Sequence, residues 1–161
     1  MKTMWAPWRM EYINGRKDDG CIFCKAISEQ DELTLYKGNT TLVVLNKYPY
    51  INGHMLVAPT RHLSSLEQLS RNEKGDLLQT VDQSIAVLKA AMHPDGFNVG
   101  LNLGKVAGAG VEAHLHFHIV PRWFGDTNAF TVFAEVRVIP EHLKSTCNNL
   151  KPYFDKINVT I

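Results

Sequence analysis

The sequence has few cysteines and no long apolar run, and each shortage excludes a class of protein. Three cysteines in 161 residues are too few, and an odd number, for a secreted disulfide scaffold. The apolar runs, such as 42–45 and 85–88, are far shorter than the roughly 18 residues that a membrane-spanning helix needs. Residues 1–13 mix charges and proline with aromatics and lack the apolar core of a signal peptide. We therefore expect a cytoplasmic protein without a membrane partner.

Charge of either sign is not in excess. Lysine and arginine number 17 against 16 aspartates and glutamates, which gives a net charge of +1. Such a balance supplies no bulk field for nucleic acid, so we expect no nucleic-acid partner, although it leaves room for a local cationic pocket. The length favours one domain at about 150 residues per domain. We expect an irregular N-terminal arm at 1–20 and a single domain at 21–161.

Short β-rich runs separated by turn signals predict a sheet. We expect a turn at Gly38–Asn39 between the first two strands. Ser70 and Glu73 have the spacing of a capping box and predict a helix that ends before Pro94, and a second helix is expected from Pro140 to about Ile157. Strands joined by short turns, with helices inserted at two places, predict an α+β fold with a mostly antiparallel sheet. The expected strands are 33–37, 40–47, 54–59, 97–103, 113–120 and 130–139.

Three of the seven histidines, His114, His116 and His118, alternate with apolar residues. A strand at 113–120 would place the three imidazoles on one face, because successive strand side chains point to opposite faces. Such a cluster costs folding energy unless a metal, an anion or another ligand satisfies it. Two chemistries remain open: a catalytic metal held by three imidazoles, or a histidine nucleophile whose neighbours position a phosphate.

The segment 104–110 favours phosphate. It is rich in glycine, precedes the histidines and offers backbone N–H groups that can form an anion-binding nest. Gly108 to Ala113 also matches the pattern G-x-G-x-x-A, but it leads into a predicted strand rather than a helix. That context excludes a dinucleotide-binding turn.

Cys21 and Cys24 have the spacing of a metal-ligand pair. Two cysteines alone are equally compatible with a redox pair or with buried thiols. A redox pair requires a helix after a sheet strand in a thioredoxin-like unit, which this neighbourhood does not supply. Cys147 is expected to pack as a small apolar side chain.

Three segments resemble the histidine triad (HIT) family. HLHFHIVPRW at 114–123 resembles its His-x-His-x-His motif, VVLNKYPYINGHMLVAP at 43–59 its strand, loop and Gly-His before a second strand, and NVGLNLG at 98–104 its nucleotide-contacting strand. The resemblance covers roughly residues 20–122. The segment from Trp123 to Glu141 and the tryptophan-rich arm resemble a bacterial branch that includes diadenosine tetraphosphate phosphorylases.

The resemblance implies an α/β-meander with a five-stranded sheet, room for two more strands, and two main helices. It also implies a homodimer, with room for higher assembly, that cleaves dinucleoside polyphosphates at an α-phosphate through a covalent nucleotidyl-histidine. His116 would be the nucleophile, and the other implied catalytic residues are His118, His114 and His54. The implied nucleotide contacts are Asn46, Asn102, Gly108, Gly110 and Arg122.

The resemblance also extends to a metal and to the reaction's second substrate. Zinc-bearing relatives imply a structural zinc on Cys21, Cys24, His62 and His114, the alternative being a site without metal. Mg²⁺ could arrive with the polyphosphate, and no organic cofactor is expected. Arg122 is a candidate for binding an orthophosphate acceptor, with Lys105 as a weaker one, and pairing of Arg122 with Asp126 is the alternative.

One departure from the family pattern bears on the substrate. Many relatives carry Gly-Gln-Ser or Gly-Gln-Thr where this chain has Gly110-Val111-Glu112, so a side-chain donor to phosphate is missing. Two alternative functions therefore stay open, hydrolysis of nucleoside phosphoramidates and non-catalytic nucleotide binding.

Overall fold

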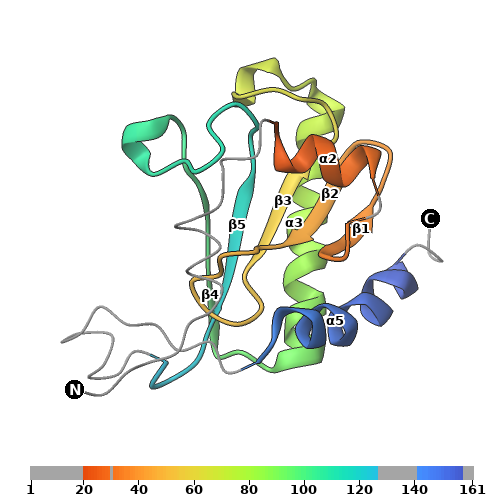
Figure 1. The fold of residues 1–161 in the computed structure, drawn as a ribbon, viewed down its shortest axis with the longest axis vertical. Helices are drawn as coiled ribbons and strands as arrows, with labels where there is room; N and C mark the ends of the chain where they lie inside the picture. Colours follow the sequence, from red (N-terminus) through yellow and green to blue (C-terminus); the bar gives the residue numbers. More distant parts are fainter. Residues whose placement is uncertain (1–19, 30, 127–140, 158–161) are drawn as a thin grey trace.

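Five strands form the sheet in this computed structural model, which describes residues 20–29, 31–126 and 141–157 (Figure 1). The strands pair antiparallel in the order β1-β2-β3-β5-β4. This confirms the α+β fold and the mostly antiparallel five-stranded sheet. The expected strand 130–139 and nearly all of the arm at 1–20 lie outside the described residues. The strands are β1 (Thr34–Lys37), β2 (Thr41–Leu45), β3 (Met55–Pro59), β4 (Gly96–Leu101) and β5 (Phe117–Arg122).

The long helix α3 (Arg71–Met92) begins and ends where the sequence predicts. The Ser70 hydroxyl accepts a hydrogen bond from the backbone N–H of Glu73, and the Glu73 side chain accepts one from the backbone N–H of Ser70. The helix ends at His93, which has the left-handed φ of 49° and precedes Pro94. None of the described helices is long and apolar enough to cross a membrane.

Two other helices differ from expectation. α5 (Leu143–Ile157) begins later than the predicted Pro140, because the His142 side chain accepts a hydrogen bond from the backbone N–H of Lys144 and so caps the helix there. α2 (Ile22–Ser28) was not predicted at all, since its seven residues are too few for a clear helical pattern.

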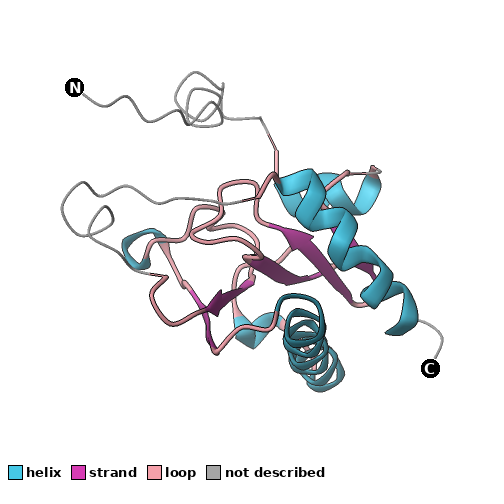
Figure 2. Cartoon of the chain, turned by 90° about the horizontal axis from the view of Figure 1, so that it is seen from below, coloured by secondary structure: helices cyan, strands magenta, loops and turns pink. Residues whose placement is uncertain are grey.

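The helices cover the two faces of the sheet, so β2 and β3 are buried throughout. One face packs on α3 and α5, and Figure 2 shows α3 end-on along that face. The opposite face, which includes Leu42 and Leu56, packs on Phe23 and Ala26 of α2. His118 of β5 is paired with Leu56 of β3, and directly paired residues share a face, so His118 lies on the α2 side of the sheet.

Candidate active site and metal centre

The triad does not lie on one strand. β5 begins at Phe117, so His114 and His116 precede it, and the prediction of a strand at 113–120 with three imidazoles on one face is wrong. The reason is that the backbone N–H of Leu115 donates to the Leu63 carbonyl, beyond the end of β3, rather than continuing the ladder. The His116 and His118 rings are neighbours, with centroids 4.9 Å apart. The His114 side chain instead faces Cys21, just before α2, and Cys24 within α2.

His54 and His118 form a hydrogen-bonded pair with a defined proton arrangement. The backbone N–H of Tyr50 donates to Nδ1 of His54 at 3.1 Å, so this nitrogen carries a lone pair. The Nε2–H of His54 therefore donates to Nδ1 of His118 at 2.9 Å. In neutral His118 the remaining proton is on Nε2, which is buried and has no hydrogen-bond partner among the described residues. The pair thus presents an unused N–H donor.

His116 has the opposite tautomer. Its Nδ1 lies 2.8 Å from the backbone carbonyl of His114, which only accepts, so Nδ1 carries the proton. Neutral His116 therefore has its lone pair on Nε2, the arrangement that a nucleophilic imidazole needs.

Burial favours the neutral forms of His116 and His118. Desolvation lowers the pKa of His118 to about 4, with a smaller contribution from His116. Desolvation also lowers the pKa of His116, opposed in part by its hydrogen bond to the His114 carbonyl. A lone pair on His116 and a donor on His118 are therefore both present at neutral pH.

Two aromatic side chains that the sequence analysis missed border this cluster. The Phe23 ring is fully buried and contacts both His114 and His116, with centroids 5.0 and 4.9 Å away. Tyr50 lies against His54 at 4.7 Å and is nearly parallel to His118. Phe23 lies between Cys21 and Cys24 in the sequence, so the cysteine spacing could have indicated that Phe23 lies next to the site. Tyr50 lies within the segment 43–59 that resembles the family, but no pattern distinguished its side chain from its neighbours.

Four side chains converge on a second cluster, which we call the Cys/His cluster: Cys21, Cys24, His62 and His114. Their ligand atoms all lie within 4.8 Å of one another. Cys21 Sγ and His114 Nδ1 are 3.2 Å apart, as are Cys24 Sγ and His62 Nδ1. The family resemblance implied this set of four as metal ligands, and the structure brings all of them together.

The chemistry of the Cys/His cluster fits a zinc ion. Sulfur and nitrogen ligands of a tetrahedral zinc with ordinary bond lengths lie about 3.6 Å apart, close to the distances found here. The Nε2–H of His114 donates to the Pro59 carbonyl at 2.8 Å, which leaves Nδ1 with its lone pair facing both sulfurs. Such a second hydrogen bond is the usual partner of a metal-binding imidazole. Burial raises the pKa of the Cys24 thiol, with further contributions from the hydrogen bond and charge of Cys21.

The expected nucleotide contacts are partly engaged within the protein. Asn46 Nδ2 lies 3.2 Å from Nδ1 of His54, and Asn46 Oδ1 accepts from the backbone N–H of Tyr48. Asn102 donates to the carbonyl of Gly108 at 3.3 Å. Within the glycine-rich loop, the backbone N–H groups at 107, 108 and 109 donate to carbonyls of the loop itself. These three N–H groups are therefore not directed at a ligand, and no contact tests Gly110.

Arg122 lies at the far end of β5 from His118. Its guanidinium makes two hydrogen bonds to the Asp126 carboxylate, at 2.6 and 2.8 Å, and one to Asn98 Oδ1 at 2.8 Å. The Asp126 carboxylate raises the pKa of Arg122. This geometry matches the expected alternative, in which Arg122 pairs with Asp126.

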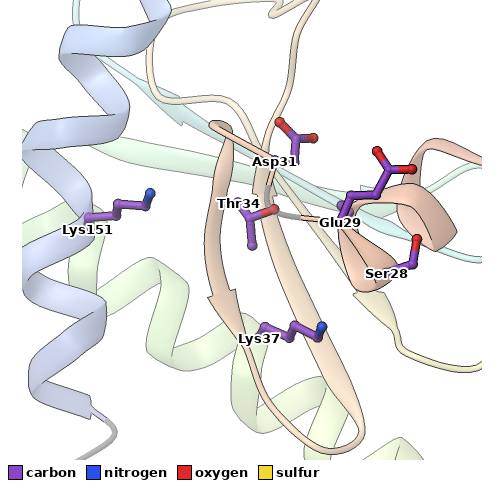
Figure 3. Close-up of a pocket in the computed structure, with 7 residues that line it drawn as sticks. Ser28, Glu29, Asp31, Thr34, Lys37 and Lys151 are labelled. Carbon is purple, nitrogen blue, oxygen red and sulfur yellow. The ribbon is translucent and has the colours of Figure 1, made fainter.

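A pocket of about 380 Å³ opens beside α2, β1 and α5 (Figure 3). Its lining carries two ammonium groups and two carboxylates, and Lys37 Nζ donates to the Ile27 carbonyl. No lining residue belongs to either histidine cluster, so we assign this pocket no part in the reaction. The labelled lining residues are Ser28, Glu29, Asp31, Thr34, Lys37 and Lys151.

Comparison with known proteins decides the family. Residues 28–125, more than half of the chain, match the HIT domain. The chain belongs to the HIT family. It is 38% identical over 157 residues to AP-4-A phosphorylase of Mycobacterium tuberculosis, a match that covers 91% of this chain and 80% of that protein.

Solved HIT structures share the fold. A zinc-bound histidine triad family protein from Mycobacterium smegmatis superposes with a TM-score of 0.71 at 25% identity, over 88% of this chain and 97% of that one. A hypothetical histidine triad nucleotide-binding protein from Sulfolobus tokodaii gives a TM-score of 0.71 at 26% identity, over 88% and 96% of the two chains. The resemblance seen in the sequence is thereby confirmed.

Proposed function

We propose that this HIT enzyme cleaves dinucleoside polyphosphates such as diadenosine tetraphosphate at an α-phosphate, through a covalent nucleotidyl-histidine on His116. The observation that carries the proposal is the pairing of an Nε2 lone pair on His116 with an unused, buried Nε2–H on the adjacent His118. The similarity to AP-4-A phosphorylase supports the substrate class.

The reaction proceeds in two displacements. Nε2 of His116 attacks the α-phosphorus, the P–N bond forms, and the P–O bond to the leaving nucleotide breaks with its electron pair on that oxygen. In the transition state, the Nε2–H of His118 donates a hydrogen bond to a non-bridging oxygen of the α-phosphate that is being transferred. A preorganised donor of this kind is typically worth about 2.7–4 kcal/mol of transition-state stabilisation. Orthophosphate or water then attacks phosphorus, and the P–N electron pair returns to His116.

In this mechanism, His54 and Asn46 position the Nε2–H donor of His118. His54 orients His118 through its Nε2–H, and Asn46 helps to keep the lone pair on Nδ1 of His54. Ribose contacts by Asn46 and Asn102, phosphate contacts by Gly108 and Gly110, and Mg²⁺ entering with the substrate all stay predictions.

The Cys/His cluster is proposed to hold a structural zinc. Its four donors come from the start of α2, the segment after β3 and the segment before β5, so a bound metal would crosslink three parts of the chain next to the nucleophile. The similar histidine triad family protein of Mycobacterium smegmatis is zinc-bound, which supports the choice of metal.

A homodimer in the cytoplasm completes the proposal. Among the described strands β4 is an edge strand, and residues 98–100 on it are exposed. An exposed edge offers unpaired backbone groups to a second copy. Light scattering on the purified protein measures the oligomeric state, and a monomer would contradict this part of the proposal.

Product analysis tests the reaction. Diadenosine tetraphosphate is incubated with the protein in the presence and absence of orthophosphate, and the nucleotides are separated. Phosphorolysis yields ADP and ATP, and hydrolysis yields AMP and ATP; either pair supports cleavage at the α-phosphate. A parallel incubation with adenosine 5′-phosphoramidate tests the alternative. Turnover of the phosphoramidate together with an intact dinucleotide would overturn the proposed substrate class.

A further inference from the structure

A buried polar network joins the loop before His54 to the beginning of α5. Thr146 Oγ1 lies 2.6 Å from Glu141 Oε2 and 2.8 Å from Asn52 Oδ1, and Asn52 Nδ2 donates to Glu141 Oε2 at 3.3 Å. Thr146 is 1% exposed and Asn52 7%. Buried polar groups are costly unless they are hydrogen-bonded, so these contacts fix the Asn52 side chain in place. We call Asn52, Glu141 and Thr146 the loop anchor.

The loop that this anchor holds is also fixed at Gly53. Gly53 has φ of +77°, and a Cβ there would lie 2.7 Å from Met92 Sδ of α3. The backbone between β2 and His54 is therefore held by α3 at residue 53 and by α5 at residue 52. Neither contact touches a histidine.

Two donors to Nδ1 of His54 depend on this loop. The first is the backbone N–H of Tyr50. The second is Nδ2 of Asn46, whose amide is oriented because its Oδ1 accepts from the backbone N–H of Tyr48. If residues 48–50 shift, Nδ1 of His54 loses one donor and the Asn46 amide is free to turn its oxygen toward the ring. His54 then gains access to its other tautomer, in which Nε2 has no proton to give to His118.

We propose that Asn52 is a positioning residue that, through Glu141 and Thr146, fixes the tautomers of His54 and His118 and so keeps the donor proton on Nε2 of His118. The tautomer assignment stands on the hydrogen bonds alone. Its catalytic meaning rests on the proposed function, in which that proton meets the phosphoryl group. α5, which packs on the opposite face of the sheet from His118, thereby acts on the active site through this loop.

The test reads tautomers directly. Nitrogen-15 NMR of the full-length protein without nucleotide, at about pH 7.5 where ordinary imidazoles are neutral, distinguishes the protonated ring nitrogen from the one with a lone pair. In the wild type we expect His54 and His118 to be protonated on Nε2. In Asn52→Ala and in the isosteric Thr146→Val, both residues should show a mixture of tautomers.

Two matched variants serve as controls. Thr146→Ser keeps the hydroxyl and should retain the wild-type tautomers. Asn149→Ala removes a hydrogen bond of 3.1 Å to the other oxygen of the same Glu141 carboxylate, without touching the loop, and should also leave the tautomers unchanged. A general loosening of the start of α5 would affect Asn149→Ala as well.

Kinetics supply the second readout. Because the donor acts in the transition state, Asn52→Ala and Thr146→Val should lower kcat at least about ten-fold, with KM changed by less than about three-fold. Unchanged tautomers in folded Thr146→Val would overturn the proposal, and this isosteric variant decides the matter if Asn52→Ala does not fold. Since the NMR needs no nucleotide, an inactive wild type would refute the proposed function and leave the test of the loop anchor intact.

Discussion

His114 and His116 are two residues apart in one motif, yet they belong to clusters of opposite character. In the Cys/His cluster, four donor atoms face one another within 4.8 Å, and the other ring nitrogen of His114 is bound to the Pro59 carbonyl. In the cluster of His54, His116 and His118, a buried N–H has no partner among the described residues, and Nε2 of His116 keeps its lone pair. A single metal ion would satisfy all four donors of the first cluster, while the second leaves a donor and a lone pair for a substrate.

The difference between the two clusters indicates where this fold can bind and react with a substrate. An unsatisfied buried polar atom costs stability, and a protein keeps one where a ligand will satisfy it. The two clusters are also physically joined: the His114 side chain faces the cysteines, while its backbone carbonyl accepts the hydrogen bond from Nδ1–H that orients His116. His114 therefore has contacts in both clusters.

The strongest test of the contrast between the two clusters is to remove the proposed nucleophile, His116. His116→Ala should lower kcat on the order of 10⁴-fold or more, because the variant lacks the imidazole that forms the bond to phosphorus in the proposed mechanism. Steady-state cleavage of diadenosine tetraphosphate measures this, and acid-labile phosphate–nitrogen linkage on wild-type His116 should be trapped by rapid quenching.

The control is His93→Asn, on an exposed histidine in the left-handed position after α3, where asparagine is well tolerated. It should keep wild-type kcat. Near-normal turnover in His116→Ala would reverse the roles assigned to the two clusters.

The next largest effect is the loss of stability expected when the Cys/His cluster can no longer bind zinc. The protein purified without chelator should contain one zinc per chain, and Cys21→Ser/Cys24→Ser should lose it. With zinc at about 1,000 times its Kd, the metal contributes about 4 kcal/mol, so the melting temperature of the double variant should fall by about 8–16 °C. Elemental analysis and thermal unfolding measure the two quantities.

Cys147→Ser is the matched control for this experiment. Cys147 is buried on α5 and donates to the Glu32 carbonyl, outside the Cys/His cluster, and serine retains a donor. It should keep its zinc. A zinc-free wild type with the stability of the double variant would show that the cluster is closed by hydrogen bonds alone.

The third experiment uses pH to sharpen the comparison. The pKa of His118 is about 4 in the folded state, below the ordinary 6.5, so between these values the unfolded chain binds a proton that the native protein does not. Stability should therefore fall as pH decreases, by about 2 kcal/mol between pH 7 and 5 from this group and by at most about 3 kcal/mol in total.

Urea unfolding at a series of pH values measures this slope. In His118→Asn the group no longer titrates, so the variant should lose about 2 kcal/mol less than the wild type between pH 7 and 5. Parallel pH curves for the two proteins would mean that the pKa of His118 is not lowered by folding. The contrast between the unsatisfied His118 and the satisfied donors of the Cys/His cluster would then be lost.

How much of this could be read from the sequence depends on the range of the interaction. The hairpin at Gly38–Asn39 and the capping box at Ser70 were correct, because turns and caps are decided by a few adjacent residues. The four metal donors were named through the family resemblance. The strand at 113–120 was wrong at its first half, because Leu115 pairs with Leu63, a contact across 52 residues that no periodicity reports.

The proton arrangement was beyond the sequence for the same reason. The tautomer of His118 follows from Tyr50 through His54, and the loop that carries Tyr50 is held by a contact between Asn52 and Thr146, which are 94 residues apart in the sequence. Periodicity identifies which side chains share an element. It does not identify which nitrogen of an imidazole meets a backbone N–H, since that is set by packing between elements.

The smallest effect is expected at Arg122, where the same criterion of open and closed groups applies. Its guanidinium is engaged by Asp126 and Asn98, so it resembles the closed cluster more than the open one. Arg122→Gln should reduce stability by about 1 kcal/mol or less, as is usual for a partly exposed ion pair, and should leave the KM for orthophosphate within about two-fold. Lys89→Gln, at an exposed position of α3, is the matched removal of a positive charge. A selective rise of the KM for orthophosphate in Arg122→Gln, with kcat and dinucleotide KM unchanged, would show that the guanidinium leaves Asp126 to bind the acceptor; a satisfied group would then no longer be a reliable sign of a structural one.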